Sequence, residues 1–369
     1  VIVVSSAMSG ATNDLVKKSK KISNNFISSE YDVLVSSGEQ ISCSLIAGRL
    51  NHLGYKSQSW MGWQIPILTE GNYSSSRISQ INKKKINKFL RSEAIPIIAG
   101  FQGINLNKRI TTLGRGGSDA TAIMFAKFFK AEKCIIYTDV DGVYTTDPKT
   151  LKKAKKIKVI SYEEMLEMSS LGAKVMQANS IQDARLNRIN IDVKSSFINK
   201  PGTLITKRKN IFNNKIITGL TSTKNDAKVT LLGVKDKPGV AASVFKPLSQ
   251  NYINIDMVVQ TSSDNKKETD ITFTIKSDNL SKTLRLIKEN KKIKFRDLIV
   301  NENVSKISII GVGMITTPGV TYRMFQTLAN KGINILVIST SEIKISVLIG
   351  KKFVKKAISA LHKEFKLNK

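Results

Sequence analysis

Long apolar runs are missing from this sequence, and cysteine is scarce. No apolar stretch approaches the roughly 18 residues that a membrane-spanning helix requires. The opening segment VIVVSSAMSG has no basic residues before its four apolar ones, so it is a poor match to a secretory signal peptide. The two cysteines, Cys43 and Cys134, both lie in apolar surroundings, and we expect buried, reduced thiols rather than a disulfide framework. These shortages predict a soluble, cytoplasmic protein.

Histidine and acidic residues are also few. The two histidines, His52 and His362, are too isolated to suggest a metal site or a catalytic triad. The 28 acidic residues are outnumbered by 59 basic ones, which gives a formal net charge of +31. Most of the excess is Lys, spread over the whole length with little aromatic interleaving, so a solvated basic surface explains it better than nucleic-acid binding. A positive field of this kind would still attract anionic substrates such as nucleotides.

What the sequence does contain, up to about residue 205, is an alternation of short apolar runs with helical patterns. This alternation predicts an α/β domain, doubly wound, with a largely parallel sheet and helices on both faces. In such sheets ligands bind beyond the carboxyl ends of the strands. We expect strands over 1–4, 31–36, 95–99, 134–138 and 192–195, and helices over 40–53 and 120–129.

The second part of the chain is an internal repeat. KVTLLGV at Lys228 corresponds to KISIIGV at Lys306, and from Pro238 and Pro318 onward the copies align without a gap. Each copy reads as a ferredoxin-like βαββαβ unit. The second copy ends before a fourth strand, so we expect the apolar segment 215–221 to cross over and complete it, which makes the first copy an insertion. The predicted domains are 1–206, a linker with the crossing strand over 207–227, and ferredoxin-like domains over 228–302 and 303–369.

The segment TTLGRGGSDATA, residues 111–122, carries an unusual density of glycine around one arginine. It fits neither a Walker loop nor GxGxxG. Its glycines would let backbone amides approach a ligand, the following helix presents free N–H groups, and Arg115 offers a planar fork for a carboxylate or phosphate. The segment is therefore a candidate anion site. A glycine-rich turn with Ser118 or Asp119 capping the helix would produce the same pattern.

Acidic residues follow the next apolar strand in IIYTDVDGVYTTDPK. Asp139 and Asp141 just past a strand end could hold Mg²⁺ or a nucleotide, with Tyr144 beside the base or ribose. A turn with ordinary Asx capping is the competing interpretation. Glu39 in SSGEQIS and Lys174 in SLGAKVMQ are further candidates, and taken singly each could equally be a solvated surface charge.

In order and spacing, six segments resemble the catalytic domain of aspartokinases: SSAMSGATN, VSSGEQIS, PIIAGFQG, TTLGRGGSDATA, YTDVDGVYTTDP and GAKV. The PGV…INI repeats resemble the paired ACT domains that follow it. This resemblance spans essentially the whole chain. It implies an amino-acid-kinase fold and transfer of the γ-phosphate of ATP, with Mg²⁺, to the β-carboxylate of L-aspartate. The product, 4-phospho-L-aspartate, leads to lysine, threonine and methionine.

The resemblance also implies roles for individual residues. Arg115 and Glu39 would clamp the α-carboxylate and amino group of aspartate, and the remaining substrate contacts would be Ser6, Thr12, Gly116, Gly117 and Ser118. Asp119 and Lys174 would be catalytic, and the ATP-binding set would be Thr138, Asp139, Tyr144, Asp147, Lys149 and Lys174. No metal site made of protein side chains is implied.

An amino-acid effector, lysine or threonine or both, would bind between the ACT domains of a homodimer or higher oligomer. The matching residues are Asp236, Pro238, Gly239, Asn254, Ile255, Asp256 and Gln260 in the first copy, and Asn334, Ile335, Ser339, Ser341 and Glu342 in the second. For Ile255 and Ile335 we expect the side chains to belong to the core. Gln260-Thr261 stands where the family often has Gln-Asn, which leaves the effector open.

One family motif is not in this sequence. The Lys-Phe-Gly-Gly-Thr-Ser stretch of the first strand would lie upstream of Val1, so we expect residues 1–369 alone to have little kinase activity. Three alternatives stay open: another amino-acid kinase, such as a glutamate or acetylglutamate kinase, a regulatory subunit or fragment that binds amino acids without catalysis, and a nucleic-acid-binding protein.

Overall fold

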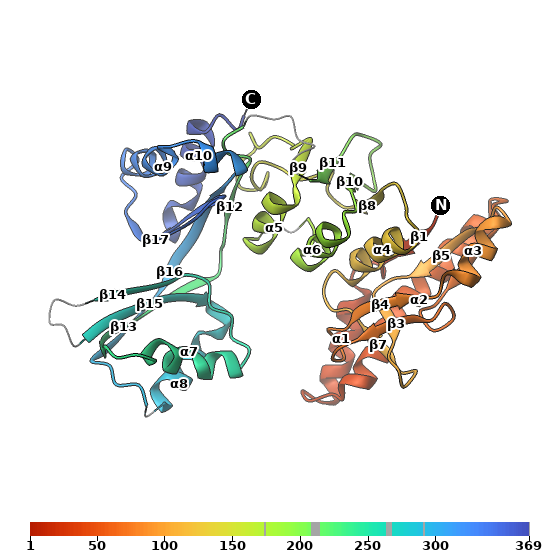
Figure 1. Cartoon of the computed structure of the whole chain (residues 1–369), viewed down its shortest axis with the longest axis horizontal. Coiled ribbons are helices and arrows are strands. Elements are labelled where there is room, and N and C mark those ends of the chain that lie inside the picture. Colours follow the sequence, from red (N-terminus) through yellow and green to blue (C-terminus); the bar gives the residue numbers. More distant parts are fainter. Residues whose placement is uncertain (173–174, 208–214, 263–267, 291, 369) are drawn as a thin grey trace. The chain divides into compact units, whose positions relative to one another are not determined.

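The computed structural model describes residues 1–172, 175–207, 215–262, 268–290 and 292–368. The chain forms two compact units, shown in Figure 1. Within the described ranges, no helix is long and apolar enough to cross a membrane. The first unit comprises Val1–Val143, Lys158–Ser170 and Lys174–Phe212, and the second comprises Tyr144–Ile157, Leu171–Ala173 and Asn213–Lys369.

The first unit contains three sheets, with strand orders β1-β5-β2, β8-β10-β11-β9 and β4-β3-β6-β7. The strands are β1 (Val3–Ser5), β2 (Ser57–Trp60), β3 (Ile67–Glu70), β4 (Arg77–Ile81), β5 (Ile95–Ala99), β6 (Gln102–Ile104), β7 (Ile110–Thr112), β8 (Cys134–Thr138), β9 (Val159–Ser161), β10 (Ile191–Ser195) and β11 (Thr203–Thr206). The helices are α1 (Ala11–Ile22), α2 (Ser28–His52), α3 (Lys83–Arg91), α4 (Gly117–Phe128), α5 (Tyr162–Ser170) and α6 (Ala178–Asn187).

Strand β5 shows why this part of the chain folds with helices on both sides of a parallel sheet. Its apolar run is buried on both faces, as is usual for a central parallel strand. Ile97 packs in a cluster with Cys43 of α2, whereas the next residue, Ile98, packs with Phe125 of α4. β1 and β2 flank β5 in parallel, and β8 pairs in parallel with β10. The α/β fold class predicted from the alternating pattern is confirmed, with parallel strand pairs in each of the three sheets. Both cysteines are buried free thiols, also as predicted.

The strand predicted over 31–36 is wrong, because these residues lie in the middle of the 25-residue helix α2. The apolar letters of YDVLVS suggested a strand. The buried residues of α2 instead share one face of the helix, with repeated spacings of three and four residues: Asp32, Val35, Ser36, Gly38, Glu39, Ser42, Cys43 and Ala47. Four of these eight residues have polar side chains and one is glycine, so the buried face of the helix could not be recognised from hydrophobic periodicity.

The second unit is built on one seven-stranded sheet of order β14-β15-β13-β16-β18-β17, with β12 also paired to β16. Its strands are β12 (Gly219–Ser222), β13 (Asp226–Lys235), β14 (Val258–Ser262), β15 (Glu268–Lys276), β16 (Asp297–Ile310), β17 (Ile335–Ser341) and β18 (Lys344–Gly350). Its helices are α7 (Val240–Gln250), α8 (Leu280–Glu289), α9 (Val320–Ala329) and α10 (Val354–Glu364).

The 14-residue strand β16 belongs to both repeats (Figure 1). Its first half pairs with β13 of the first copy, and from Val304 onward it pairs with β18 of the second. β12 takes the fourth place in the second copy's sheet, on the other side of β16, through Gly219↔Ile310 to Ser222↔Ile307. Each copy has its own core, the first around Val229 and Phe273 and the second around Ile307 and Val347.

Candidate functional site

The carboxyl group of Glu39 lies on the buried side of α2. Only 4% of the residue is exposed, and the backbone N–H of Ala7 donates to Oε1 at 3.1 Å. The other oxygen, Oε2, is buried and has no hydrogen-bond partner among the described residues. Burial raises the pKa of Glu39 to about 7, although the bond from Ala7 opposes that shift. A buried carboxylate with one oxygen unused is suited to receive a cationic group such as an amine.

Close packing brings the loop after β1 against this helix. An added Cβ at Gly38 would lie 2.9 Å from the Cβ of Ala7, so only glycine lets the loop approach α2 at this point. Ser5, at the carboxyl end of β1, bonds through its hydroxyl to that of Ser42 at 2.7 Å. Its carbonyl accepts from the N–H of Gly100, just past the carboxyl end of β5, at 3.0 Å. The ends of two parallel strands therefore meet beside Glu39.

The Gly-Arg loop joins the same place. A Cβ at Gly100 would lie 2.8 Å from Oγ of Ser118, in the first turn of α4, so β5 ends directly against the start of that helix. Gly116 is the N-cap residue of α4 with φ 74°, and no side chain caps the helix. Arg115, beside it, is exposed to solvent. The arrangement places an uncapped helix N-terminus and a guanidinium at the carboxyl edge of the sheet, where an anion would be favoured.

The glycines of this loop serve packing as well as ligand approach. A Cβ at Gly117 would meet the ring of Phe101 at 2.6 Å. At Gly116 it would meet Gln177 at 2.6 Å, and Ser180 also donates to the Gly116 carbonyl at 3.1 Å. The prediction that these glycines are present to open the backbone toward a ligand is therefore incomplete, because protein atoms already fill the space of the absent side chains.

Asp32 connects α2 to the strand that leads into the Gly-Arg loop. This fully buried carboxylate accepts from the N–H and the hydroxyl of Thr112, at 2.7 and 2.9 Å, and from the N–H and the hydroxyl of Ser74, at 2.9 and 2.8 Å. A Cβ at Gly114 would in turn lie 3.0 Å from the Ser74 carbonyl. Asp32 and Glu39 are seven residues apart on the same face of α2, so one rigid helix positions both the carboxylate and the loop.

Asp119 lies in the first turn of α4, where its negative charge suits the helix dipole. Burial nevertheless raises its pKa to about 6. Glu39 and Asp119 therefore share one property: both carboxyl groups are desolvated, and a cation brought by a ligand would stabilise their ionised forms.

The remaining substrate candidates lie at the edge of this region. Ser6 is exposed just after β1, and its carbonyl accepts from the Ser5 hydroxyl at 3.2 Å. Thr12 is the second residue of α1, the helix that follows the same loop.

The predicted nucleotide residues are divided between the two units. In the first unit, Thr138 ends β8, and its hydroxyl donates to the carboxylate of Asp139 at 3.2 Å. Tyr144, Asp147 and Lys149 lie in the second unit. The carboxylate of Asp147 accepts from the N–H of Lys149 at 2.8 Å, which is the Asx-type turn considered as the alternative. Lys174 lies outside the described residues.

The predicted effector residues lie mainly in exposed turns of the two repeats. Asp236, Pro238 and Gly239 form the exposed turn before α7, Asn254 is exposed, and Gln260 is exposed on the edge strand β14. Asn334 and Ser339 are exposed in the second copy. Ile255 and Ile335 pack against the two cores, so the expectation for these side chains is confirmed. Ser341 and Glu342 line a hollow of about 500 Å³ with the Pro318-Gly319 turn.

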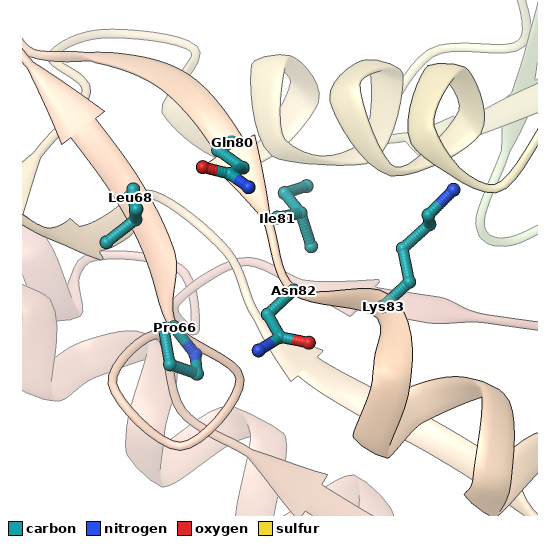
Figure 2. A pocket seen from close by; sticks show the side chains of 6 residues that line it. All are labelled: Pro66, Leu68, Gln80, Ile81, Asn82 and Lys83. Carbon is teal, nitrogen blue, oxygen red and sulfur yellow. The ribbon is translucent and has the colours of Figure 1, made fainter.

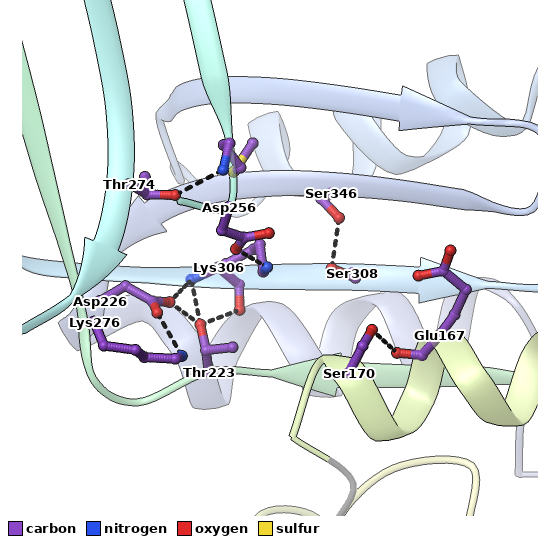
Figure 3. Close-up of polar contacts among 11 residues, drawn as sticks. Glu167, Ser170, Thr223, Asp226, Asp256, Thr274, Lys276, Lys306, Ser308 and Ser346 are labelled. Atoms are coloured by element: carbon purple, nitrogen blue, oxygen red, sulfur yellow. Dashed lines mark hydrogen bonds and ion pairs between the residues drawn. The ribbon is translucent and has the colours of Figure 1, made fainter. Parts of the chain in front are cut away.

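Asp256 is engaged within the second unit. Its carboxylate pairs with the ammonium of Lys306 on β16, a side chain that is only 5% exposed (Figure 3). The backbone N–H of Lys306 also donates to the hydroxyl of Thr223 at 3.2 Å. Asp226 bonds to Thr223 and is paired at 2.8 Å with Lys276. The loop that carries Asp256 is thereby tied to β16, the strand that both copies share.

Two further features of the described residues give no additional site. A hollow of about 350 Å³ in the first unit contains none of the predicted site residues and has a single charged lining group, Lys83; its lining is Pro66, Leu68, Gln80, Ile81, Asn82 and Lys83 (Figure 2). Among the residues that the structure describes, no three His, Cys, Asp or Glu side chains gather as ligands for a metal ion.

Asp32 and Gly38 support the site but could not be recognised from the sequence. Both lie on α2, and Asp32 falls within the segment assigned to a strand. Asp32 lies seven residues before Glu39, and Gly38 lies one residue before it. These spacings indicate a shared role only once the segment is known to be helical.

Comparisons with known proteins follow the same division of the chain. The model of the amino acid kinase family matches residues 1–195, and an ACT domain model matches 229–290 and 307–365. The aspartate kinase Ask_LysC of Stutzerimonas stutzeri is 42% identical over 370 residues, which cover 100% of this chain and 90% of the relative. The aspartokinase of Helicobacter pylori is also 42% identical, over 372 residues covering 100% of this chain and 91% of the relative.

Solved structures agree with these sequence relatives. E. coli aspartokinase III in complex with aspartate and ADP is similar with a TM-score of 0.76 at 25% identity, covering 95% of this chain and 79% of that one. The same enzyme in complex with lysine and aspartate gives a TM-score of 0.76 at 26% identity, covering 96% of this chain and 79% of that one.

Proposed function

The chain belongs to the aspartate kinases of the amino acid kinase family, and we propose that L-aspartate binds where the carboxyl ends of β1 and β5 meet the N-terminus of α4. The family reaction transfers the γ-phosphate of ATP to the β-carboxylate of aspartate, and it opens the synthesis of lysine, threonine and methionine. The observation that carries our proposal is the buried carboxyl of Glu39, whose Oε2 has no partner within the described residues.

Glu39 holds the amino group of the substrate. A substrate ammonium placed at Oε2 satisfies that oxygen and favours the ionised carboxylate, which burial alone disfavours. Arg115 takes the α-carboxylate, because its exposed guanidinium can donate two parallel hydrogen bonds. Ser6, Thr12, Ser118 and the loop amides of Gly116 and Gly117 complete the set.

With both ends of the amino acid fixed, the β-carboxylate is the group left free to face the nucleotide. It is already ionised at neutral pH and needs no general base. The chain's contribution is therefore positioning and neutralisation of the charge that spreads over the transferring phosphate. Thr138, Asp139, Tyr144, Asp147, Lys149 and Lys174 bind ATP.

Mg²⁺ enters this site with ATP, held chiefly by the phosphate oxygens, as Mg²⁺ usually is in kinases. It supplies positive charge at the β- and γ-phosphates when bound. Asp119, ionised above its raised pKa of about 6, is assigned to organise a cation, either the metal or the catalytic lysine, Lys174.

An amino-acid effector acts through the two ACT copies. Lysine, or lysine with threonine, binds near the backbone of Asn254 and Asn334 and beside Ser341 and Glu342, at an interface between two copies of the chain. E. coli aspartokinase III, a structural relative, has been solved with lysine, which supports this choice. β14 and β17 are the edge strands of the seven-stranded sheet and offer unpaired backbone groups for such pairing.

Substituting Arg115 tests the aspartate site. We expect Arg115→Lys to weaken aspartate binding by at least about tenfold, since a lysine cannot make the bidentate contact, while ATP binding changes by less than twofold. Calorimetric titration of each ligand gives both constants, and ADP release gives the turnover. Arg109→Lys is the matched control, because Arg109 is an exposed arginine of the same unit paired with Glu30. Unchanged aspartate binding in Arg115→Lys would refute this placement.

A further inference from the structure

Residues 144–157, which we call the nucleotide loop, pack with the second ACT copy. The loop carries three predicted ATP contacts, Tyr144, Asp147 and Lys149, yet it falls in the same compact unit as the repeats. The carbonyl of Thr145 accepts from the N–H of Leu220, in the crossing strand β12, at 2.7 Å. Leu151 packs against the core cluster that contains Ile307 and Val347. The loop is thus held to the second copy by both a strand contact and an apolar contact.

A side-chain hydrogen bond fixes the same loop to helix α10. Oγ1 of Thr145 lies 2.9 Å from Nε2 of His362, and both residues are buried, His362 to 2% exposure. Oγ1 also accepts from the N–H of Lys155 at 3.0 Å, so one hydroxyl closes the loop on itself and joins it to the helix. Burial lowers the pKa of His362, and the imidazole is therefore neutral at physiological pH. A neutral imidazole can form a hydrogen bond with the Thr145 hydroxyl without the free-energy cost of burying a charge.

The first repeat has a position equivalent to His362, on helix α8, that is exposed and not covered by a loop. β15 and β18 end at Lys276 and Gly350, and each is followed by a three-residue 3-10 turn and then by α8 or α10. Counting from these ends, Lys288 of α8 corresponds to His362 of α10. Lys288 is exposed, whereas His362 is buried beneath Thr145. The face of α10 at His362 is therefore specialised for the nucleotide loop and is not a requirement of the ferredoxin-like fold.

We propose that His362 and Thr145 form a positioning contact through which the second ACT copy holds the nucleotide loop in its ATP-binding conformation. The proposal rests on the proposed assignment of Tyr144, Asp147 and Lys149 to ATP. A conformational change in the second copy would reach the nucleotide through this pair. His362 is assigned no contact with the substrate. Its substitution should therefore change the affinity for the nucleotide and not the phosphoryl-transfer step itself.

The test compares Thr145→Val and His362→Phe, which remove the hydrogen bond while filling the space, with Thr145→Ser, which keeps the hydroxyl. We expect ADP to bind about three- to tenfold more weakly in the first two variants, as loss of one buried neutral hydrogen bond allows, while aspartate binding is unchanged. Hydrogen exchange in the full chain should become faster within residues 144–157. Thr145→Ser should restore both readouts, and the double variant should add little to either single one.

Thr230→Val is the matched control, because the Thr230 hydroxyl bonds to Thr272 at 3.0 Å in the first copy, away from the loop. It should leave ADP affinity and loop exchange unchanged. Equal exchange of 144–157 in wild type and in His362→Phe would overturn the proposal. If wild type binds no ADP, the assignment of the ATP site fails, and loop exchange still decides whether His362 holds the loop. His362→Gln, which retains polarity, replaces His362→Phe if that variant does not fold.

Discussion

Among single residues, Glu39 is expected to make aspartate binding depend on pH near neutrality. Burial gives its carboxyl a pKa of about 7 in the folded chain, above the ordinary value of 4.5. Between these values the folded state binds more protons than the unfolded state, so the contribution of Glu39 to stability falls as pH rises through this window. Aspartate binding has the opposite dependence, because the substrate ammonium needs the ionised carboxylate.

We therefore predict that aspartate affinity rises about fourfold between pH 6.5 and pH 8, as the ionised fraction of a group with a pKa of about 7 increases. Calorimetric titration with aspartate across this range measures the rise. The pKa of Asp119 is about 6, so it is largely ionised throughout the window. Glu39→Gln should bind aspartate weakly with a flat profile and should be more stable than wild type at pH 8. If the Glu39→Gln variant kept the wild-type slope, another group would be responsible for the titration.

At the scale of one element, α2 gathers most of the site's support. It carries Glu39, it is connected through Asp32 to the strand before the Gly-Arg loop, and it is approached at Gly38 by the loop after β1. Two glycines in this helix, Gly38 and Gly48, allow the effect of helix propensity to be distinguished from the effect of packing. An added Cβ at Gly38 would lie 2.9 Å from Ala7 Cβ, whereas at Gly48 it would meet nothing within 4 Å.

Gly48→Ala is expected to stabilise the chain by about 1 kcal/mol, the usual gain from replacing glycine inside a helix. Gly38→Ala has the same intrinsic gain, but it must push the Ala7 loop away, which offsets the gain and breaks the N–H bond to Glu39. We predict weaker aspartate binding, by about fivefold or more, for Gly38→Ala only. Urea unfolding and calorimetric binding of both variants check this. Equal effects of the two substitutions on binding would remove the role given to Gly38.

The same helix shows how far sequence reasoning reached. Glu39 stands in a recognisable motif, yet the segment 31–36 before it reads as a strand because it is a short apolar run. Propensity was overridden by tertiary contacts: Asp32 is stable in the core only because Ser74 and Thr112 supply four hydrogen bonds. Such partners are distant in sequence, so no local pattern could disclose them. The glycines of the Gly-Arg loop can be recognised from the local sequence. Their packing partners are distant in sequence and cannot be recognised in this way.

At the scale of the whole molecule, the repeat was the most predictable feature, because its two copies align residue by residue and each buries its own core. Local patterns contained less information about how the copies are joined. The end of the first copy and the start of the second form one continuous strand, β16, which runs without interruption through residues 302 and 303. The association of 144–157 with the second copy was not predicted either, since it depends on long-range contacts such as Thr145 with His362.

The ion pair between Lys306 of β16 and Asp256 of the first copy should respond unequally to the loss of either partner, because the two side chains differ in burial. The Lys306 side chain is 5% exposed and that of its partner Asp256 is 48% exposed. Asp256→Asn should therefore leave a buried ammonium without its counter-ion and cost about 2 kcal/mol, less than for a fully buried pair. Lys306→Met instead removes the buried charge and leaves a carboxylate that water can solvate, so its cost should stay below about 1 kcal/mol.

Urea midpoints at pH 7 compare these two variants of the ion pair, with Asp236→Asn in the exposed turn before α7 as the control. The Lys306 pair also restrains the loop that carries Asn254, which we propose as an effector contact, so Lys306→Met should change the affinity for lysine in calorimetric titration while preserving stability. A larger stability loss in Lys306→Met than in Asp256→Asn would contradict the inference that the buried ammonium depends on its partner more than the exposed carboxylate does.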